Sequence, residues 1–153
     1  GACLDPHPAY LILRGIKTLA LRMNKHNENA LELAPWLSRH DMIEKVFYPG
    51  LDTHEGSEIA QQQMKGYGGV LSFSIKDEKK IPNFISNLTF AHAAAHLGSL
   101  DTIVGPPQTT SHVENSAEER IQLGIPNNLI RCSVGIEHID DIKNDFDQAL
   151  LKL

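Results

Sequence analysis

Apolar residues recur along the chain at two spacings, and the spacing separates predicted helices from predicted strands. A first helix is predicted to begin at Asp5, because Pro6 and Pro8 suit a first helical turn. Its apolar residues at helical spacing are Ile12, Ile16, Leu19 and Met23. Further helices are predicted over residues 29–40, 57–65, 81–88 and 139–153, and from the capping box Ser116–Glu119 up to Gly124.

Strict alternation predicts a half-buried strand over residues 70–75, with Leu71, Phe73 and Ile75 on one face and Ser72 and Ser74 on the other. Residues 45–48 and 129–134 are also predicted strands. The segment 90–104 mixes alanines with β-branched residues, and we expect two short strands around Gly98. Because helices and strands alternate irregularly and the strands are half-polar, the predicted fold class is α+β. We expect a mainly antiparallel sheet that helices cover on one face.

Composition narrows the class of protein. The 153 residues fit one domain, and 41% hydrophobic and 22% charged residues are ordinary for a globular chain. A net charge of -5 disfavours nucleic acid and anionic membranes as partners. No stretch is long and apolar enough to span a bilayer. Cys3 and Cys132 are too few for a disulfide scaffold, so a cytoplasmic location is expected.

Arg131 is the residue that most suggests chemistry. Period two places Ile130, Cys132 and Val134 on the core face of their strand, so Arg131 and Ser133 project from the opposite face. A guanidinium can hold a carboxylate through parallel charge-assisted hydrogen bonds, as amino-acid substrates are often held. From spacing alone, a surface arginine or a structural ion pair is the commoner interpretation of such a residue, since such pairs are common on strands.

Other chemical motifs are weaker. His92 and His96 have the spacing of zinc ligands, but no third ligand is marked, and we expect no metal. Ser111 and His112 are adjacent, yet a nucleophile and its base are defined by spatial geometry, and no nucleophile elbow is present. The glycines of Gly66–Gly69 lead into a strand and not a helix, so a phosphate cradle is not indicated.

An ordered set of motifs resembles the Cys/Met-metabolism (trans-sulfuration) family of pyridoxal-phosphate (PLP) enzymes. This family includes cystathionine γ-synthase, cystathionine γ- and β-lyases, methionine γ-lyase and the O-acylhomoserine sulfhydrylases. The motifs are Tyr10–Met23 (YLILRGIKTLALRM), His26–Ala30 (HNENA), Tyr48–Leu51 (YPGL), Gly66–Phe73 (GYGGVLSF), Thr110–His112 (TSH) and Arg131–Glu137 (RCSVGIE). Together they cover essentially the whole chain.

The resemblance implies that residues 1–153 are the small C-terminal domain of a fold-type I PLP enzyme. The large domain, with the catalytic lysine, would then lie outside this chain, which should be inactive alone. The resemblance implies that Arg131 binds the substrate α-carboxylate, that His96 and Ala95 border the substrate, and that Ser111 and Leu97 border the cofactor pocket. His96 departs from a family serine, and Ser111 replaces a threonine.

The implied function is elimination or replacement at Cβ or Cγ of an amino acid such as cystathionine, O-acylhomoserine, methionine or cysteine. The implied cofactor is PLP, bound mainly by the missing domain, and the implied assembly is a homotetramer. An alternative from another class is a non-catalytic binding or regulatory module that retains the small-domain fold.

Overall fold

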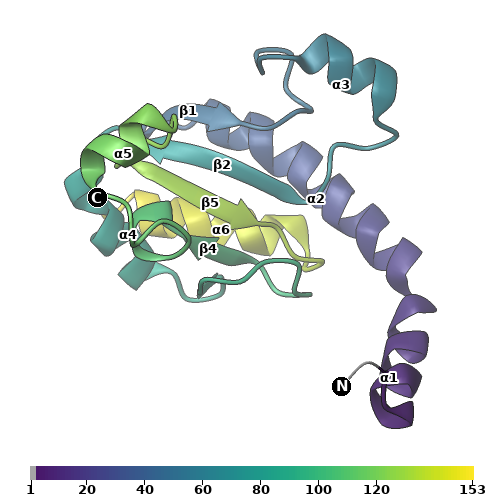
Figure 1. The fold of residues 1–153 in the computed structure, drawn as a ribbon. Helices are drawn as coiled ribbons and strands as arrows, with labels where there is room; N and C mark the ends of the chain where they lie inside the picture. Colours follow the sequence, from purple (N-terminus) through teal and green to yellow (C-terminus); the bar gives the residue numbers. More distant parts are fainter. Residues whose placement is uncertain (1–2) are drawn as a thin grey trace.

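A computed structural model describes residues 3–153 (Figure 1). The helices are α1 (Pro6–Ile16), α2 (Leu19–Ser38), α3 (Ser57–Gln63), α4 (Ile81–Asn87), α5 (Ala117–Gln122) and α6 (Ile139–Leu150). The strands are β1 (Ile43–Phe47), β2 (Val70–Ile75), β3 (His92–Ala93), β4 (Ile103–Gly105) and β5 (Leu129–Ser133). Within residues 3–153, no helix has the length and apolar character needed to cross a membrane.

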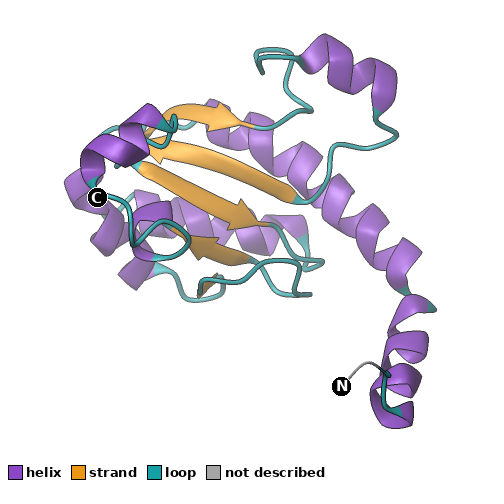
Figure 2. Ribbon diagram, in the orientation of Figure 1, coloured by secondary structure: helices purple, strands orange, loops and turns teal. Residues whose placement is uncertain are grey.

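The strands form one mixed sheet in the order β1-β2-β5-β4-β3 (Figure 2). The pairs β1–β2, β2–β5 and β5–β4 are antiparallel, and β3–β4 is parallel. The prediction of an α+β fold with a mainly antiparallel sheet is therefore confirmed. β5 is the central strand, so a side chain in its middle lies far from either sheet edge.

Helices α2, α4 and α6 supply the core that covers one face of the sheet (Figure 1). The alternation predicted from the sequence is observed, because Phe73 of β2 and Cys132 of β5 are both fully buried against this layer. Phe84 and Phe146 pack edge to face at a centroid distance of 5.7 Å, which joins α4 to α6. Within residues 3–153, loops and the short helix α5 lie on the opposite face (Figure 1), and we call it the open face.

The N-terminal helices differ from the prediction. The backbone breaks at Lys17 and Thr18, inside the first predicted helix, and residues 19–38 form one helix that joins the end of that prediction to the helix predicted over residues 29–40. At the break, the carbonyl of Gly15 accepts hydrogen bonds from the Thr18 backbone N–H and from Arg22 Nη2. The apolar residues keep their helical spacing across Lys17 and Thr18. The hydrophobic pattern therefore cannot reveal the short irregular turn at these two residues.

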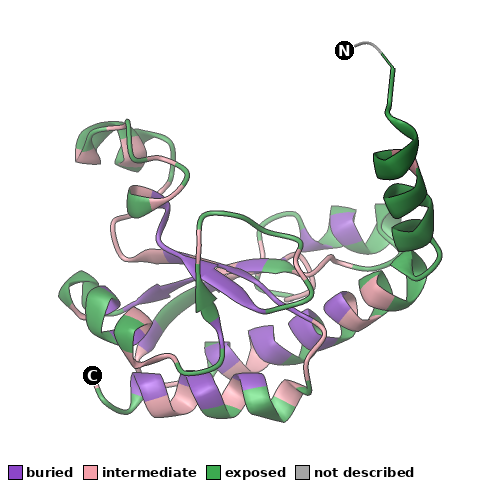
Figure 3. Cartoon of the chain, turned by 90° about the horizontal axis from the view of Figure 1, so that it is seen from below, coloured by how far each residue is buried: buried purple, intermediate pink, exposed green. Residues whose placement is uncertain are grey.

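Helix α1 projects away from the rest of the domain, and most of it is exposed (Figure 3). The exposed apolar residues on α1 and the start of α2 are Tyr10, Leu11, Ile12, Leu13, Ile16, Leu19, Leu21 and Met23. They include all four residues of the apolar stripe predicted from the sequence. Their spacing predicted a helix correctly, but the domain itself does not cover that stripe.

Asp145 of α6 fastens the segment that leads into β3. Its carboxylate is buried and accepts hydrogen bonds from the backbone N–H groups of Thr89, Phe90 and Ala91 and from the Thr89 hydroxyl, all between 2.8 and 3.0 Å. Burial alone would raise the pKa of Asp145, but the hydrogen bonds from Ala91, Thr89 and Phe90 outweigh it and hold the pKa below its ordinary value. The carboxylate is therefore ionised and structural.

Candidate functional site

Arg131 lies in the middle of β5, and its side chain leaves the strand on the open face. Its register partners are Ser72 on β2 and Gly105 on β4, which are both small. A Cβ atom at Gly105 would lie only 2.9 Å from the Ala94 carbonyl oxygen and 3.0 Å from a methyl carbon of Thr110. The glycine thus lets both flanking loops approach the strand next to Arg131.

The guanidinium of Arg131 is held from one side. Its Nη2 atom donates to the carbonyl oxygens of Ala95 and His96, at 3.1 Å each. Its Nε and Nη1 atoms donate to no group within residues 3–153, and no carboxylate of that part of the chain forms an ion pair with it. An arginine has five N–H donors, so those on Nε and Nη1 remain for a ligand. The structural ion pair left open by the sequence is therefore not formed in the described part of the chain.

The remaining residues predicted for the site lie on the two loops that border Arg131. Ala95 and His96 contact Arg131 through their backbone carbonyls, and the side chains of both are exposed. Leu97 is 55% exposed and follows them directly. On the second loop, the Ser111 hydroxyl lies 2.8 Å from Nδ1 of His112 and is also exposed. The fold therefore brings these predicted residues to the loops of one face, although they come from separate segments.

The two histidines considered as zinc ligands do not share a helix. His92 is in β3, and His96 is in the loop after it, so a separation of four residues does not align the imidazoles. Among residues 3–153, no group of three or more His, Cys, Asp or Glu side chains could hold a metal ion.

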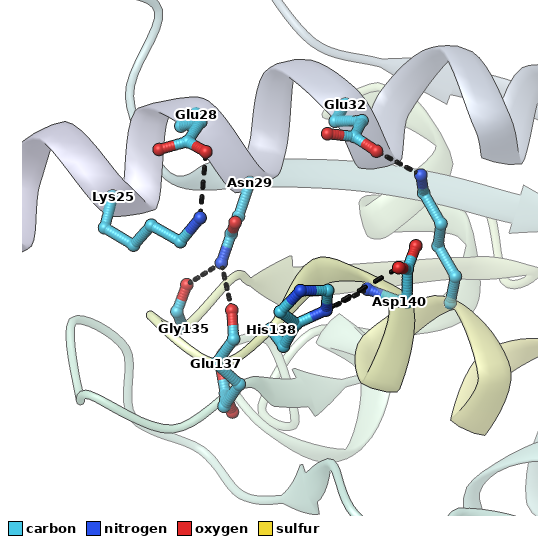
Figure 4. A network of polar contacts seen from close by, with 9 residues as sticks. Lys25, Glu28, Asn29, Glu32, Gly135, Glu137, His138 and Asp140 are labelled. Carbon is cyan, nitrogen blue, oxygen red and sulfur yellow. Dashed lines mark hydrogen bonds and ion pairs between the residues drawn. The ribbon is translucent and has the colours of Figure 1, made fainter.

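A network under the site joins two of the sequence motifs. In the 131–137 motif, the Glu137 carboxylate accepts from the backbone N–H and the hydroxyl of Thr102 at 2.5 and 2.9 Å. Gly135 N–H donates to the same hydroxyl at 2.9 Å. From α2, Asn29 Nδ2 donates to the carbonyls of Gly135 and Glu137 (Figure 4). His26 Nδ1 donates to the Val134 carbonyl at 2.6 Å.

These contacts give a structural role to residues that sequence reasoning treated only as motif letters. The 26–30 segment on α2 bonds directly to the 131–137 segment, and Asn29 and Thr102 both bond Gly135 and Glu137. The sequence signal that could have identified these residues is the occurrence of both polar motifs in one chain, since buried polar side chains require hydrogen-bond partners. Spacing alone could not have said which residues those partners were.

A pocket of about 560 Å³ lies beside the site, between α4 and the two loops. Ala95, Gly105 and Thr110 line it, but Arg131 and His96 do not. None of its lining residues is ionisable. It therefore cannot select an amino acid by charge, and Arg131 is the better guide to the chemistry of this face.

Comparison with known proteins adds a family. A sequence model described as "Cys/Met metabolism PLP-dependent enzyme" matches residues 1–151. The chain is 42% identical over 152 residues to a cystathionine beta-lyase of Lactococcus lactis subsp. cremoris (strain MG1363), covering 99% of this chain and 40% of that protein. It is 41% identical over 154 residues to an L-methionine gamma-lyase of Fusobacterium nucleatum subsp. polymorphum, covering 100% of this chain and 39% of that protein.

A cystathionine gamma-lyase of Bacillus subtilis (strain 168) is 39% identical over 150 residues, which are 98% of this chain and 40% of that protein. The chain thus spans about 40% of the length of the curated relatives that it matches.

Proposed function

Because the chain belongs to the family of Cys/Met metabolism PLP-dependent enzymes, we propose that residues 1–153 are the small domain of a lyase or transferase acting on sulfur amino acids. Within it, Arg131 binds the α-carboxylate of the substrate. His96 and Ala95 border the substrate, and Leu97 and Ser111 border the cofactor. Elimination or replacement at Cβ or Cγ of cystathionine, methionine or a related amino acid is the reaction class.

The observation that carries this proposal is the state of Arg131. A cation in the centre of a sheet face has its Nη2 atom fixed by the carbonyls of Ala95 and His96, while Nε and Nη1 donate to nothing within residues 3–153. The two carbonyl oxygens that bind Nη2 are neutral, so the positive charge of the guanidinium is not neutralised by them. A carboxylate is the ligand that both completes the hydrogen bonds and balances the charge.

The residues of this chain fit PLP as border contacts and not as its main holders. None of the lysines is buried, so none has the desolvated setting in which a lysine becomes a nucleophile at neutral pH. The glycines at residues 66–69 precede β2 and not a helix, so they form no phosphate cradle. The exposed Leu97 side chain and Ser111 hydroxyl offer an apolar surface and a hydrogen-bonding group instead.

When bound, PLP supplies the electron sink for carbanion chemistry at the amino acid. The contribution of this chain is orientation. Holding the carboxylate at Arg131 fixes the rotation of the amino acid about its Cα, and so decides which Cα bond is presented for cleavage. The backbone carbonyl of His96 contacts Arg131 and its imidazole is exposed, and we propose this imidazole as a proton-transfer group at the substrate.

We also propose that the exposed apolar residues of α1 and the start of α2 are covered in the complete protein, by its other domain or by further subunits of a homotetramer. The exposed fractions of Ile12, Leu13 and Ile16 are 52%, 63% and 56%, which is unusual for neighbouring large apolar residues on one helix. Cys3 and Cys132 are both free thiols, which supports the expected cytoplasmic location.

The test uses the complete enzyme loaded with PLP. Arg131→Ala should raise KM for L-cystathionine on the order of 100-fold, because a charged hydrogen bond contributes roughly 1.5–3 kcal/mol. The PLP absorbance of the variant should remain that of the parent. An unchanged KM would remove Arg131 from the substrate site. Amino-acid binding without turnover in the parent protein would favour a non-catalytic binding module.

A further inference from the structure

We propose that Ser133 is a positioning residue for Arg131, acting through the loop 94–101. This inference rests on the proposed role of Arg131 and deepens it. Ser133 does not touch the guanidinium itself. It holds the loop whose two carbonyl oxygens hold the guanidinium, so the strand that presents Arg131 also fixes the direction in which that side chain points.

The first contact joins Ser133 to the loop. Ser133 lies two residues after Arg131 on the same face of β5, but it is only 3% exposed because the loop covers it. Its hydroxyl accepts the backbone N–H of Gly98 at 3.0 Å. Gly98 has φ +82°, a left-handed conformation that any residue with a Cβ adopts at a cost. The Ser133 hydroxyl is thus bonded to the backbone at the residue where the loop has this left-handed conformation.

The second contact joins the loop to Arg131. The carbonyls of Ala95 and His96 come three and two residues before Gly98, and both accept from Nη2 of Arg131. The loop is also bonded two residues after Gly98, where Ile136 N–H donates to the Leu100 carbonyl at 2.8 Å. On the other side of the two carbonyls, Ala94 N–H donates to the Val104 carbonyl at 3.1 Å, so Ser133 is the nearest anchor that follows them in sequence.

Arg131, Ser133 and Ile136 all lie within the seven-residue segment 131–137, and each bonds a different part of the loop. Gly135 has no room for a Cβ, which would lie 2.4 Å from the Leu100 carbonyl oxygen and 2.6 Å from the Thr102 nitrogen. The segment and the loop are thus packed against each other along their length. Arg131 is the charged side chain of this set, and its Nε and Nη1 donors are unused within residues 3–153.

Preorganisation is the expected benefit. A free arginine side chain samples many rotamers, and ordering it on binding opposes affinity. Fixing Nη2 before the substrate arrives removes part of that cost, so substrate carboxylate meets a guanidinium already in place. Loss of the Ser133 hydroxyl leaves the loop bonded at Ala94 and Leu100 but free to shift between them at residues 95–98, and the arginine shifts with it.

The test compares two buried serines in the complete, PLP-loaded enzyme. Ser133→Ala should raise KM for L-cystathionine roughly three- to tenfold, the loss expected for one hydrogen bond, with kcat changed less than KM. The matched control is Ser74→Ala. Ser74 is also 3% exposed and bonds a backbone carbonyl, that of Lys45, away from Arg131. It should leave KM unchanged while lowering the melting temperature about as much as Ser133→Ala.

A second variant approaches the same contact from the loop. In Gly98→Ala the added Cβ has no atom within 4 Å, so it does not clash, but the left-handed backbone conformation at residue 98 becomes strained. Gly98→Ala should raise KM for L-cystathionine about as much as Ser133→Ala does. The double variant Arg131→Ala/Ser133→Ala should have the KM of Arg131→Ala alone, since Ser133 acts only through the arginine.

The outcomes separate the two proposals. If Arg131→Ala raises KM but Ser133→Ala and Gly98→Ala do not, the positioning role is wrong and the carboxylate role stands. Additive effects in the double variant would also overturn positioning. If Arg131→Ala leaves KM unchanged, the proposed substrate site itself fails, whatever the serine variant does.

Discussion

Asp145 and Arg131 are both charged groups held by neutral groups of their own chain, yet the two regions use charge differently. Asp145 is 4% exposed and lies on the helix-covered side, where both carboxylate oxygens accept backbone N–H groups. Arg131 is partly exposed on the open face, and only its Nη2 atom is bonded within the described chain. A charge whose hydrogen bonds are complete stabilises the fold, whereas a charge with unused donors is prepared for a ligand.

The difference follows from what each charge faces. The hydrogen bonds of Asp145 come from three consecutive residues, 89–91, so one carboxylate orders the whole approach to β3. Arg131 faces two loops that leave the rest of its guanidinium open. The comparison can be tested by separating effects on stability from effects on substrate binding.

The largest effect is expected for Asp145→Ala. It would leave the backbone N–H groups of residues 89–91 without their acceptor and Ala91, the buried one of the three, with an unpaired donor, which costs roughly 1–3 kcal/mol. We expect a loss of about 3–5 kcal/mol in the free energy of unfolding of residues 1–153, measured in urea through the fluorescence of Trp36. The matched control is Asp141→Ala on the exposed side of the same helix, which should cost at most about 1 kcal/mol. Equal losses in the two variants would show that the Asp145 contacts contribute little.

A smaller effect, on binding and not on stability, is expected for Arg131→Lys. Lysine keeps the charge but has a single nitrogen, which cannot reach both loop carbonyls and a carboxylate. KM for L-cystathionine in the complete enzyme should rise roughly tenfold, less than for Arg131→Ala, with an unchanged melting temperature. A KM equal to that of the parent would mean that charge alone, and not the guanidinium geometry, matters at this position.

Acid should weaken the Asp145 region selectively. Its pKa is lower in the folded than in the unfolded chain, so its stabilising effect is complete above the ordinary aspartate pKa of about 4 and is lost as the pH falls through the lower, folded value. The difference in unfolding free energy between the parent and Asp145→Asn should therefore be constant from pH 7 to 5 and shrink below pH 4. A difference that grows in acid would contradict the sign of this shift.

The smallest effect is expected for Ile16→Ser on α1. Ile16 is 56% exposed and belongs to neither charged region, so its replacement should change the unfolding free energy of residues 1–153 by less than about 0.5 kcal/mol. The same change in the complete protein should reduce the assembled fraction in size-exclusion chromatography. A large loss of stability in residues 1–153 would show that α1 packs on this domain after all.

Several elements could be predicted from the sequence because local chemistry specifies them. The alternation at 70–75 gave β2 its bounds and its buried face, and the same period put Arg131 opposite Cys132. The capping box at Ser116 is present with both of its hydrogen bonds. The two short strands around Gly98 are present as β3 and β4.

Other features could not be predicted, because they depend on contacts between distant segments. The break between α1 and α2 leaves the apolar period intact, so no pattern marks it. Asp145 and Thr89 are 56 residues apart, and Ser133 and Gly98 are 35 apart. No local signal says that one is the partner of the other. The sequence predicts Ser133 as a polar residue that projects from the face opposite the core, whereas in the structure the loop 94–101 buries it.

The sequence alone determined the class of fold, the two faces of the central strands and the family, since periodicity and motif order are local and survive without coordinates. Only the tertiary structure decided which charged side chains have all their hydrogen bonds made within the chain and which keep donors for a ligand. Hydrogen-bond completion depends on where the chain returns in space, and a carboxylate and a guanidinium that look alike in sequence therefore have different roles at Asp145 and Arg131.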